Sequence, residues 1–486
     1  MNTTNEGRWT DQAQADAASA NGKVQTYRDK ARQLFEQEIY PRWISAENVW
    51  RTAWAMDTIL DYFAASGVDS RPYGDAAIGA LDPTQAGNWW DDFGWIGIAA
   101  LRAAEQGFAP QRRDDFLKIA INAWAYMYGP GWSLQPGAAI YPFRELPGWG
   151  PFADGHPNNI GAPNVGKRIG QTRPNPSPSP NAWMMPRRTP GGAWNSPITA
   201  NDYPDPVPSR QSQWWRSYLN PVQNTVTNGL YALLSLRLHR ASRNPAFTSV
   251  FRASALNASA CASAWSEQIV WFDQWMVGTP QADQSLLMAL PAGALVRERV
   301  STFQPVGPNA QLYWDAMYRS TLAWTGDQGL LLGALREAQG AWPGGVTPKV
   351  LGLYPGLIEG VFKNAYQPRN YGAVSGDFPM PWLDTASASP YDAPSPGNDD
   401  GDYQTGVGVF MRYLLQAWRA NPMPLQAYRA QILANADAIV ESGFGEQANP
   451  GGACDAFTPR WGSVADTMTA YVNRLSVLVL AIAMAR

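Results

Sequence analysis

Histidine and cysteine are both scarce in this sequence of 486 residues, since each occurs only twice. His156 lies in a Pro/Gly-rich stretch and His239 lies far along the chain, so a histidine-based metal site or a serine–histidine triad lacks the residues it needs. Cys261 and Cys454 are far apart, at a spacing that matches no zinc or redox motif, and we interpret both as free thiols. These shortages exclude enzymes with a histidine-based metal site or a serine–histidine triad, and we expect neither a metal nor a cofactor.

Charge is also sparse: charged residues make up 16% of the chain, the net charge is -3, and no long basic run occurs. A nucleic-acid partner is therefore not expected. The apolar run at 475–485 is too short to span a bilayer and predicts a buried final helix. The start of the sequence lacks the basic and apolar segments of a secretory signal. We expect a soluble protein without a membrane partner, monomeric by default, and cytoplasmic as written or secreted or periplasmic if a signal was removed.

Tryptophan, in contrast, is abundant, with 23 in the sequence. Many stand beside Gly, Asn or Asp rather than in apolar runs, as do Trp89, Trp90 and Trp194. A flat indole face covers the C–H face of a sugar ring while nearby amides and carboxylates bond its hydroxyls. As a set, the tryptophans predict a carbohydrate-binding cleft, although packing in a large core is the better explanation for any single one.

Apolar residues recur at helical spacing along the chain, and no strand alternation competes with this pattern. Between 47 and 66, for example, Val49, Ala53, Met56 and Leu60 are three or four residues apart. The predicted helices cover residues 22–40, 47–66, 89–107, 110–128, 222–243, 247–276, 311–339, 403–420, 424–442 and 463–485. Helices joined by short turns predict an all-α protein of stacked helical hairpins, as an open solenoid or a closed toroid.

Two stretches break the helical pattern. Residues 129–221 hold 18 of the 40 prolines and six tryptophans. A loop of this length is disordered or functional, and its aromatic residues favour an ordered wall beside a cleft. Residues 368–402 form the second stretch, which runs into an acidic segment, NDDGDY (398–403), that lacks calcium-loop spacing and is interpreted as a solvated turn capping the next helix. We expect a tail at 1–21 and a single domain over 22–486 with the excursion at 129–221.

The most informative segment is NWWDDFGWIGIAALRAAE, 88–105, in which Asp91 and Asp92 precede an apolar helix. Helix capping is the plain explanation, because carboxylates at a helix start face free backbone N–H groups. Trp89, Trp90 and Trp95 reduce the solvation of the pair, however, and two crowded carboxylates do not ionise freely, so a raised pKa is expected for one of them. Glycoside cleavage needs one ionised and one protonated carboxyl, and neighbouring positions suit the separation of about 5 Å found in retaining enzymes.

The segment resembles the Asp-Asp motif of glycoside hydrolase family 76, the endo-α-1,6-mannanases. Further segments resemble motifs of that family in the same order: GGAWN (191–195), QNTVTNGLYALLSLRLHR (223–240), WTGDQGLLLGALREA (324–338) and GVGVFMRYLLQAW (406–418). The resemblance covers about residues 45–485. It departs from the family where a Tyr-Asn pair is replaced by Gly326-Asp327, and the loop 129–221 is longer than expected for the family.

The resemblance implies an (α/α)6 toroid with long irregular loops walling a cleft, a mannan-type carbohydrate substrate and retaining chemistry. It also implies that Asp91 is the nucleophile and Asp92 the general acid/base, although the sequence alone allows the two roles to be exchanged. We expect sugar contacts from a further set of residues: Trp89, Trp90, Trp194, Asn195, Asn228, Asp327, Gln328 and Asp57. Two of them have plain alternatives, since Asn228-Gly229 can be a helix kink and Asp57 an exposed helix position.

Other functions remain open at this stage. A non-catalytic carbohydrate-binding or scaffold protein on the same toroid is the main alternative, followed by a hydrolase of different sugar specificity, an inverting hydrolase, a lyase or an epimerase. A terpene cyclase is disfavoured, because DDFGW lacks the third acidic residue of an Asp-Asp-x-x-Asp motif.

Overall fold

The computed structural model describes most of the chain outside the long Pro-rich stretch. The described residues are 21–128 except 47, 84–85 and 87–89; 184–186; 223–278 except 255; 285–305 except 301–302; 321–385 except 344 and 372–373; 400–442; 456–457; and 464–486. The predicted tail, except its last residue, and nearly all of the excursion at 129–221 therefore lie outside the described residues.

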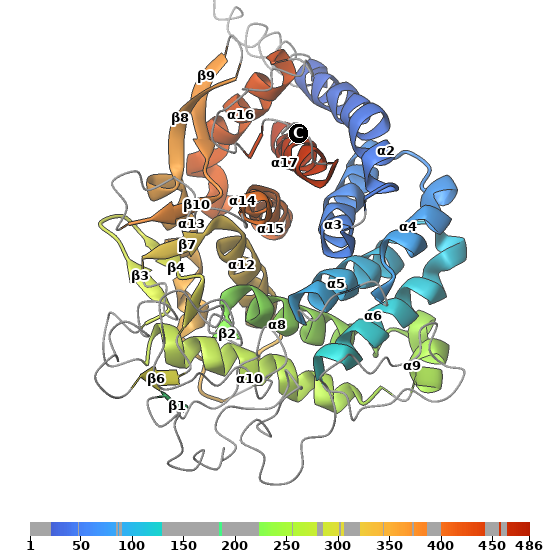
Figure 1. The fold of residues 1–486 in the computed structure, drawn as a ribbon, viewed down its shortest axis with the longest axis vertical. Coiled ribbons are helices and arrows are strands. Elements are labelled where there is room, and N and C mark those ends of the chain that lie inside the picture. Colours follow the sequence, from blue (N-terminus) through green and yellow to red (C-terminus); the bar gives the residue numbers. More distant parts are fainter. Residues whose placement is uncertain are drawn as a thin grey trace, which may run out of the picture.

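Six helices in the described part of the chain form an inner ring (Figure 1). They are α3 (Val49–Ser66), α5 (Trp90–Gln106), α8 (Thr225–Ala241), α12 (Thr325–Gln339), α15 (Gly406–Ala420) and α17 (Val464–Ala485). Each contacts the next, and α17 returns to α3. The closed ring excludes the open solenoid that the sequence left as an alternative.

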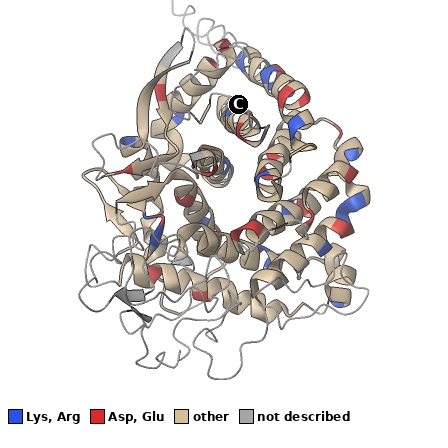
Figure 2. Cartoon of the chain, in the orientation of Figure 1, with Lys and Arg blue, Asp and Glu red and all other residues tan. Residues whose placement is uncertain are grey.

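An outer layer packs against this ring. It consists of the helix at 21–33 with its continuation η1 (Leu34–Ile39) and α2 (Tyr40–Trp43), then α4 (Gly74–Ala80), α6 (Arg113–Tyr128), α10 (Ala258–Met276), α13 (Tyr354–Asn364) and α16 (Arg429–Glu441). Both basic and acidic residues lie along the outer helix at 21–43 (Figure 2). Inner and outer helices alternate along the chain, so the protein is an (α/α)6 toroid, as predicted.

Local sequence signals explain where several helices begin and end. Asn48, Asn224 and Asn257 have extended backbones and accept hydrogen bonds from backbone N–H groups in the first turns of α3, α8 and α10. Gly67 ends α3 in the left-handed region, at φ 70°. The first asparagine of QNTVTNG, Asn224, is thus the N-terminal cap of α8.

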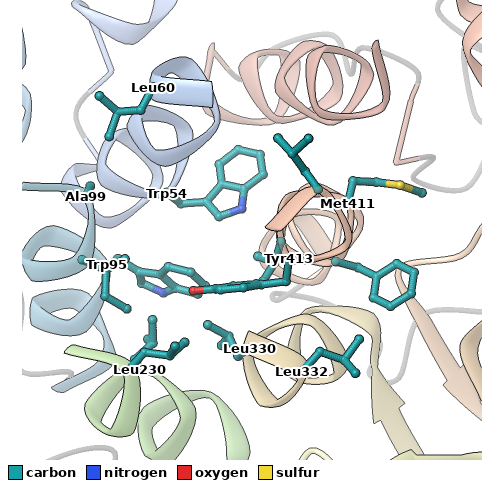
Figure 3. Close-up of a cluster of buried hydrophobic side chains, with 14 of the residues drawn as sticks. Trp54, Leu60, Trp95, Ala99, Leu230, Leu330, Leu332, Met411 and Tyr413 are labelled. Carbon is teal, nitrogen blue, oxygen red and sulfur yellow. The ribbon is translucent and has the colours of Figure 1, made fainter. Parts of the chain in front are cut away.

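Glycines let the inner helices approach one another closely. A Cβ on Gly97 of α5 would lie 2.5 Å from Leu234, and one on Gly329 of α12 would lie 2.7 Å from the Phe410 backbone. Large side chains fill the remaining interior: the labelled residues in Figure 3 include Trp54 of α3, Trp95 of α5, Leu230 of α8, Leu330 of α12 and Tyr413 of α15. The ring is therefore a packed core.

Helix α17 is long and apolar enough to cross a membrane, but 94% of its most apolar window is buried inside the structure. It lies in the inner ring between α15 and α3. The expected role of run 475–485 as a buried final helix is confirmed.

Short antiparallel ribbons, which the sequence pattern did not predict, connect the helices. They pair β2 (Gln223–Asn224) with β5 (Arg299–Val300), β7 (Leu322–Trp324) with β10 (Trp382–Asp384), β8 (Tyr366–Tyr371) with β9 (Val374–Pro379), β3 (Leu287–Ala289) with β4 (Ala294–Val296), and β1 (Met184–Pro186) with β6 (Phe303–Pro305). Strands of two to six residues are too short for a visible alternation. The first two ribbons matter for function, because they lead into α8 and α12.

Two predicted helix ranges are corrected. Residues 311–320 of the range 311–339 lie outside the described residues; from 321 onward the range is helical only from Thr325, since β7 occupies 322–324. The range 247–276 holds two helices, α9 (Thr248–Ser254) and α10, with the cap residue Asn257 between them.

Candidate active site

The N-terminal ends of the inner helices meet at one end of the ring. Arg51, in the first turn of α3, binds Asp402 at 2.6 Å and also binds Asp466 in the first turn of α17. Asp402 lies in the short helix α14 (Asp400–Tyr403), which leads into α15. One guanidinium thereby joins two inner helices, α3 and α17, to the short helix that precedes a third, α15.

The starts of the other inner helices, α12, α8 and α5, are connected to the same cluster of residues around Arg51 and α14. The Trp324 indole N–H, at the start of α12, donates to the Tyr403 carbonyl at 2.8 Å. The Tyr403 hydroxyl donates to Glu298 at 3.0 Å, and the Glu298 carbonyl accepts from the Thr225 N–H at the start of α8 at 2.7 Å. Helix α5 reaches the group through Asp91, which interacts electrostatically with Asp402. This convergence defines the candidate active site.

Asp91 and Asp92 occupy the first turn of α5 at this end. Asp92 is 8% exposed, and Asp91 is partly buried. The Asp91 carboxyl accepts from the N–H groups of Asp91 and Asp92, which favours its ionised form, but its Oδ1 is buried without a hydrogen-bond partner among the described residues. Burial, reinforced by the charge of Asp402, outweighs the N–H groups and raises the pKa of Asp91 to about 7.

Asp327 is a second buried carboxyl of the site, in the first turn of α12. Its side chain is inaccessible, and neither oxygen has a hydrogen-bond partner in the described part of the chain. Burial raises its pKa well above the ordinary value, and the charges of Glu298 and Asp91 raise it further, while Arg299 acts in the opposite direction. Burial and the neighbouring carboxylates therefore favour the protonated form of Asp327, which interacts electrostatically with Asp91.

Glu298 and Arg299 form a buried ion pair beside Asp327. The β2–β5 ribbon sets Arg299 opposite Asn224, the cap of α8, and so brings this pair to the site. Neither residue was expected from the sequence, because nothing in the segment LVRERV marks it as facing a cleft. The same holds for Asp402, which belongs to the run interpreted as a solvated capping turn.

Three expected sugar contacts have other roles. Trp90 is completely buried in the core, 6.0 Å from Phe93 between ring centroids, so its faces are not available for stacking on a sugar. Gln328 is also buried, and its amide binds the backbone carbonyls of Val296 and Trp324 and the Val296 N–H. Asn228 is buried within α8 and donates to the Asn224 carbonyl at 2.7 Å. The side chains of Trp90 and Gln328 therefore turn into the ring and not towards a ligand. Asn228 instead stabilises the first turn of α8.

Asp57 is likewise corrected from a cleft residue to a core residue. It forms ion pairs with Arg102 of α5 and Arg412 of α15, all of them buried. Burial alone would raise the pKa of Asp57, but these arginines, with Arg237, lower it below its ordinary value. The remaining expected contacts, Trp89, Trp194 and Asn195, lie outside the described residues.

The site end is rich in carboxyl groups. Its described acidic residues are Asp91, Asp92, Asp327, Glu298, Asp402 and Asp466, against the basic residues Arg51 and Arg299. No group of three or more metal-ligating side chains occurs among the described residues. Raised pKa values favour the protonated forms of Asp91 and Asp327, and the excess of acidic over basic residues repels anionic ligands.

Comparison with known proteins gives structural matches only. No protein-family model and no curated protein matches the sequence. Among solved structures, the chain is similar to an inactive variant of the α-1,6-mannanase from Salegentibacter sp. HEL1_6 in complex with α-1,6-mannotetrose, at 12% identity and a TM-score of 0.48, over 93% of this chain and 99% of that one. It is also similar to a protein from Listeria innocua, at 12% identity and a TM-score of 0.45, over 89% and 84%.

A third match is a family 76 glycoside hydrolase from a bovine Bacteroides thetaiotaomicron strain, at 12% identity and a TM-score of 0.43, over 90% of this chain and 68% of that one. Because these TM-scores lie below 0.5 and the identities are low, we base neither a family assignment nor an activity on the three matches.

Proposed function

We propose that this protein is a glycoside hydrolase in which Asp91 and Asp92 carry the reaction. The observation that supports this proposal is the raised pKa of Asp91, to about 7, directly beside a second buried carboxyl in the first turn of α5. Glycoside cleavage uses one carboxyl that protonates the leaving oxygen and one carboxylate that attacks the anomeric carbon. A carboxyl that titrates near neutral pH can hold the proton for the first of these steps.

The substrate we propose is a neutral α-linked glycan of the α-1,6-mannan type. The linkage and the sugar come from the motifs of the sequence, and the charge of the site agrees with a neutral substrate, since the acidic residues at the ring end outnumber the basic ones. Uronic acids and sulfated glycans would meet repulsion at such a site. Adjacent carboxylates suit the short separation of a retaining mechanism.

The motif resemblance and the electrostatics differ on which of Asp91 and Asp92 is the nucleophile and which is the proton donor. The resemblance implies that Asp91 attacks, whereas the raised pKa of Asp91 favours Asp91 as the proton donor in the free protein. Trapping with a 2-deoxy-2-fluoro glycoside separates the two, because fragmentation of the labelled peptide by mass spectrometry shows which aspartate carries the sugar.

The proposal as a whole is tested by a substrate screen. Neutral α-1,6-mannan oligosaccharides, α-glucans and an α-linked uronic-acid oligomer are incubated with the protein and with the Asp91→Asn/Asp92→Asn double variant. NMR follows the anomer formed first. We expect cleavage of a neutral substrate with retention, and none by the variant. Tight sugar binding without cleavage of any substrate would overturn the proposal in favour of a carbohydrate-binding protein.

A further inference from the structure

The Arg412 guanidinium is buried inside the inner ring of helices with only part of its hydrogen-bonding capacity used. Its side chain is 0% exposed. Nη1 donates to the Trp54 carbonyl at 3.1 Å and lies 2.7 Å from Asp57 Oδ2. Nε and Nη2 have no hydrogen-bond partner among the described residues. These two nitrogens form one edge of the planar group, and such an edge binds an acceptor through two N–H bonds.

Aromatic side chains lie next to this guanidinium. Its central carbon is 5.9 Å from the ring centroid of Trp95 and 5.8 Å from that of Tyr413, and both side chains point into the interior, as does Trp54 (Figure 3). An aromatic face attracts a cation but does not replace an acceptor in the plane of the guanidinium. The Trp54 indole N–H and the Tyr413 hydroxyl are themselves buried without a partner in the described part of the chain. The interior therefore holds further groups that can donate.

The carboxylates that pair with Arg412 and its neighbours are shared between arginines. Asp57 pairs with Arg102 as well as with Arg412, and Asp61, one turn further along α3, pairs with Arg102 and Arg419. If either carboxylate turned to the Nε–Nη2 edge, another arginine would lose its partner, and an unpaired buried charge is strongly destabilising. The acceptor for this edge therefore has to come from elsewhere.

A second arginine with an unpartnered nitrogen approaches from α8. Arg237 donates to Glu337 through Nε and Nη2, at 2.8 and 2.6 Å, and to Gln416 through Nη2 at 3.1 Å, while its buried Nη1 has no partner among the described residues. Gln416 follows Arg412 by four residues on α15, so the two share one face of that helix. Arg237 thus reaches the face of α15 on which Arg412 lies.

The net charge of this interior does not oppose an anion. Its arginines are at least as many as its carboxyl groups: they are Arg102, Arg237, Arg240, Arg412 and Arg419, against Asp57, Asp61, Glu337 and Glu105. The acidic end of the ring, with Asp91 and Asp327, is a different environment.

We propose that the Nε–Nη2 edge of Arg412 binds a small monovalent anion inside the ring, with chloride as its ligand. A halide accepts several N–H bonds and donates none, which matches a buried edge made only of donors. A water molecule has to donate as well as accept, and both carboxylates nearby already hold two arginines each. The site involves neither Asp91 nor Asp92, so the inference is independent of the proposed function.

The first test locates the ion in the unaltered protein. Crystals of the full chain are grown in sodium bromide, and anomalous scattering is measured at the bromine edge. We expect an anomalous peak within hydrogen-bond distance of Arg412 Nε and Nη2. A water molecule at this edge, or bromide on the protein surface only, overturns the inference.

The second test measures binding in solution by urea unfolding, with chloride replaced by gluconate at constant ionic strength. A ligand that binds only the folded state lowers the equilibrium constant for unfolding, by about tenfold for each tenfold rise in chloride above its dissociation constant. We expect this dependence in the wild type and its loss in Arg412→Lys, which keeps the charge beside Asp57 but lacks the Nε–Nη2 edge.

Arg419→Lys is the matched control, because it makes the same change at an arginine that is 41% exposed. We expect it to keep the chloride dependence of the wild type. A wild type that does not respond to chloride, or an equal response in Arg412→Lys, contradicts the site. If Arg412→Lys does not fold, the bromide position in the wild type decides alone. Neither measurement uses a glycan, so a protein that cleaves none refutes the proposed function and leaves the anion site to be judged separately.

Discussion

Arg412 of α15 reaches across the inside of the ring to Asp57 of α3, with 2.7 Å between Nη1 and Oδ2. Both side chains are fully buried. Towards the C-terminal ends of the same helices, Asp61 pairs with Arg102 and Arg419. The inner helices thus carry balanced charge along their bodies and towards their C-terminal ends, whereas Asp91 and Asp327 at their N-terminal ends are left with high pKa values.

Removal of Arg412 is predicted to destabilise the protein strongly. In Arg412→Met the Asp57 carboxylate loses one of its two buried partners, and breaking a buried pair typically costs about 3–5 kcal/mol. Arg419→Met is the control, because Arg419 is 41% exposed and such pairs contribute about 0–1 kcal/mol. Urea unfolding measures both free energies, and equal losses would contradict the burial argument.

Asp91→Asn and Asp92→Asn are each predicted to lower the rate of glycan hydrolysis by at least about 10²–10⁴-fold, the range for loss of a general acid or base. Both amides match the shape of the carboxyl, so the melting temperature is not expected to fall. Turnover on the best substrate of the screen and thermal unfolding are measured in parallel. Wild-type turnover in either variant would refute the assignment of that residue.

The contribution of Asp327 to the free energy of unfolding is predicted to become less favourable as the pH rises. Its pKa is raised in the folded state, so between the unfolded value of about 3.9 and the folded value the native protein binds the extra proton. Stability from this group is complete below about pH 3.9 and declines as the pH rises towards the folded pKa. Asp327→Asn abolishes this dependence, so the free energy of unfolding of the variant relative to the wild type is expected to be larger at pH 7 than at pH 4.

Urea unfolding at both pH values tests this expectation. Asp75→Asn serves as the control, since Asp75 is 89% exposed and the difference for this variant is expected to stay nearly constant. A relative stability of Asp327→Asn that is equal at pH 4 and pH 7 would show that Asp327 is ionised in the folded protein.

Two glycine-to-alanine substitutions are predicted to change the free energy of unfolding in opposite directions. In Gly329→Ala the new methyl group would lie 2.7 Å from the Phe410 Cα, and overpacking of this kind costs about 1–3 kcal/mol. In Gly79→Ala, at an exposed position of α4 with nothing within 4 Å, the higher helix propensity of alanine is expected to add about 1 kcal/mol. Chemical denaturation of both variants is the measurement, and a stabilised Gly329→Ala would contradict the close packing of α12 on α15.

The helical part of the fold was predictable because its signal is local. The periodicity around Val49 to Leu60 needs only a few turns of sequence, and the observed helix α3 runs from Val49 to Ser66. The short ribbons were not predictable, since Arg299 pairs with Asn224 across a long sequence separation and neither strand exceeds two residues. Tertiary pairing determines such strands.

The candidate site was predictable in its Asp-Asp segment and at Asp327, which the sequence analysis expected to contact sugar. Asp91 and Asp92 stand out because tryptophans flank them, whereas Glu298, Arg299 and Asp402 gain significance only when the ring brings distant segments together. Buried polar residues caused the opposite error: Gln328 and Asp57 have the side chains expected of sugar ligands, but both bind other parts of the protein. Sequence does not distinguish a polar group that faces a ligand from one that faces its own backbone.

The contact between Arg51 and Asp466 joins residues separated by 415 positions. During synthesis, helix α3 leaves the ribosome long before α17, and until α17 is made the flank of α3 that it covers has no partner. Closing so long a loop is slow relative to forming the helical hairpins in between. A nascent chain therefore exposes an apolar seam for most of its translation, and we expect its folding in the cell to depend on chaperones that shield this seam.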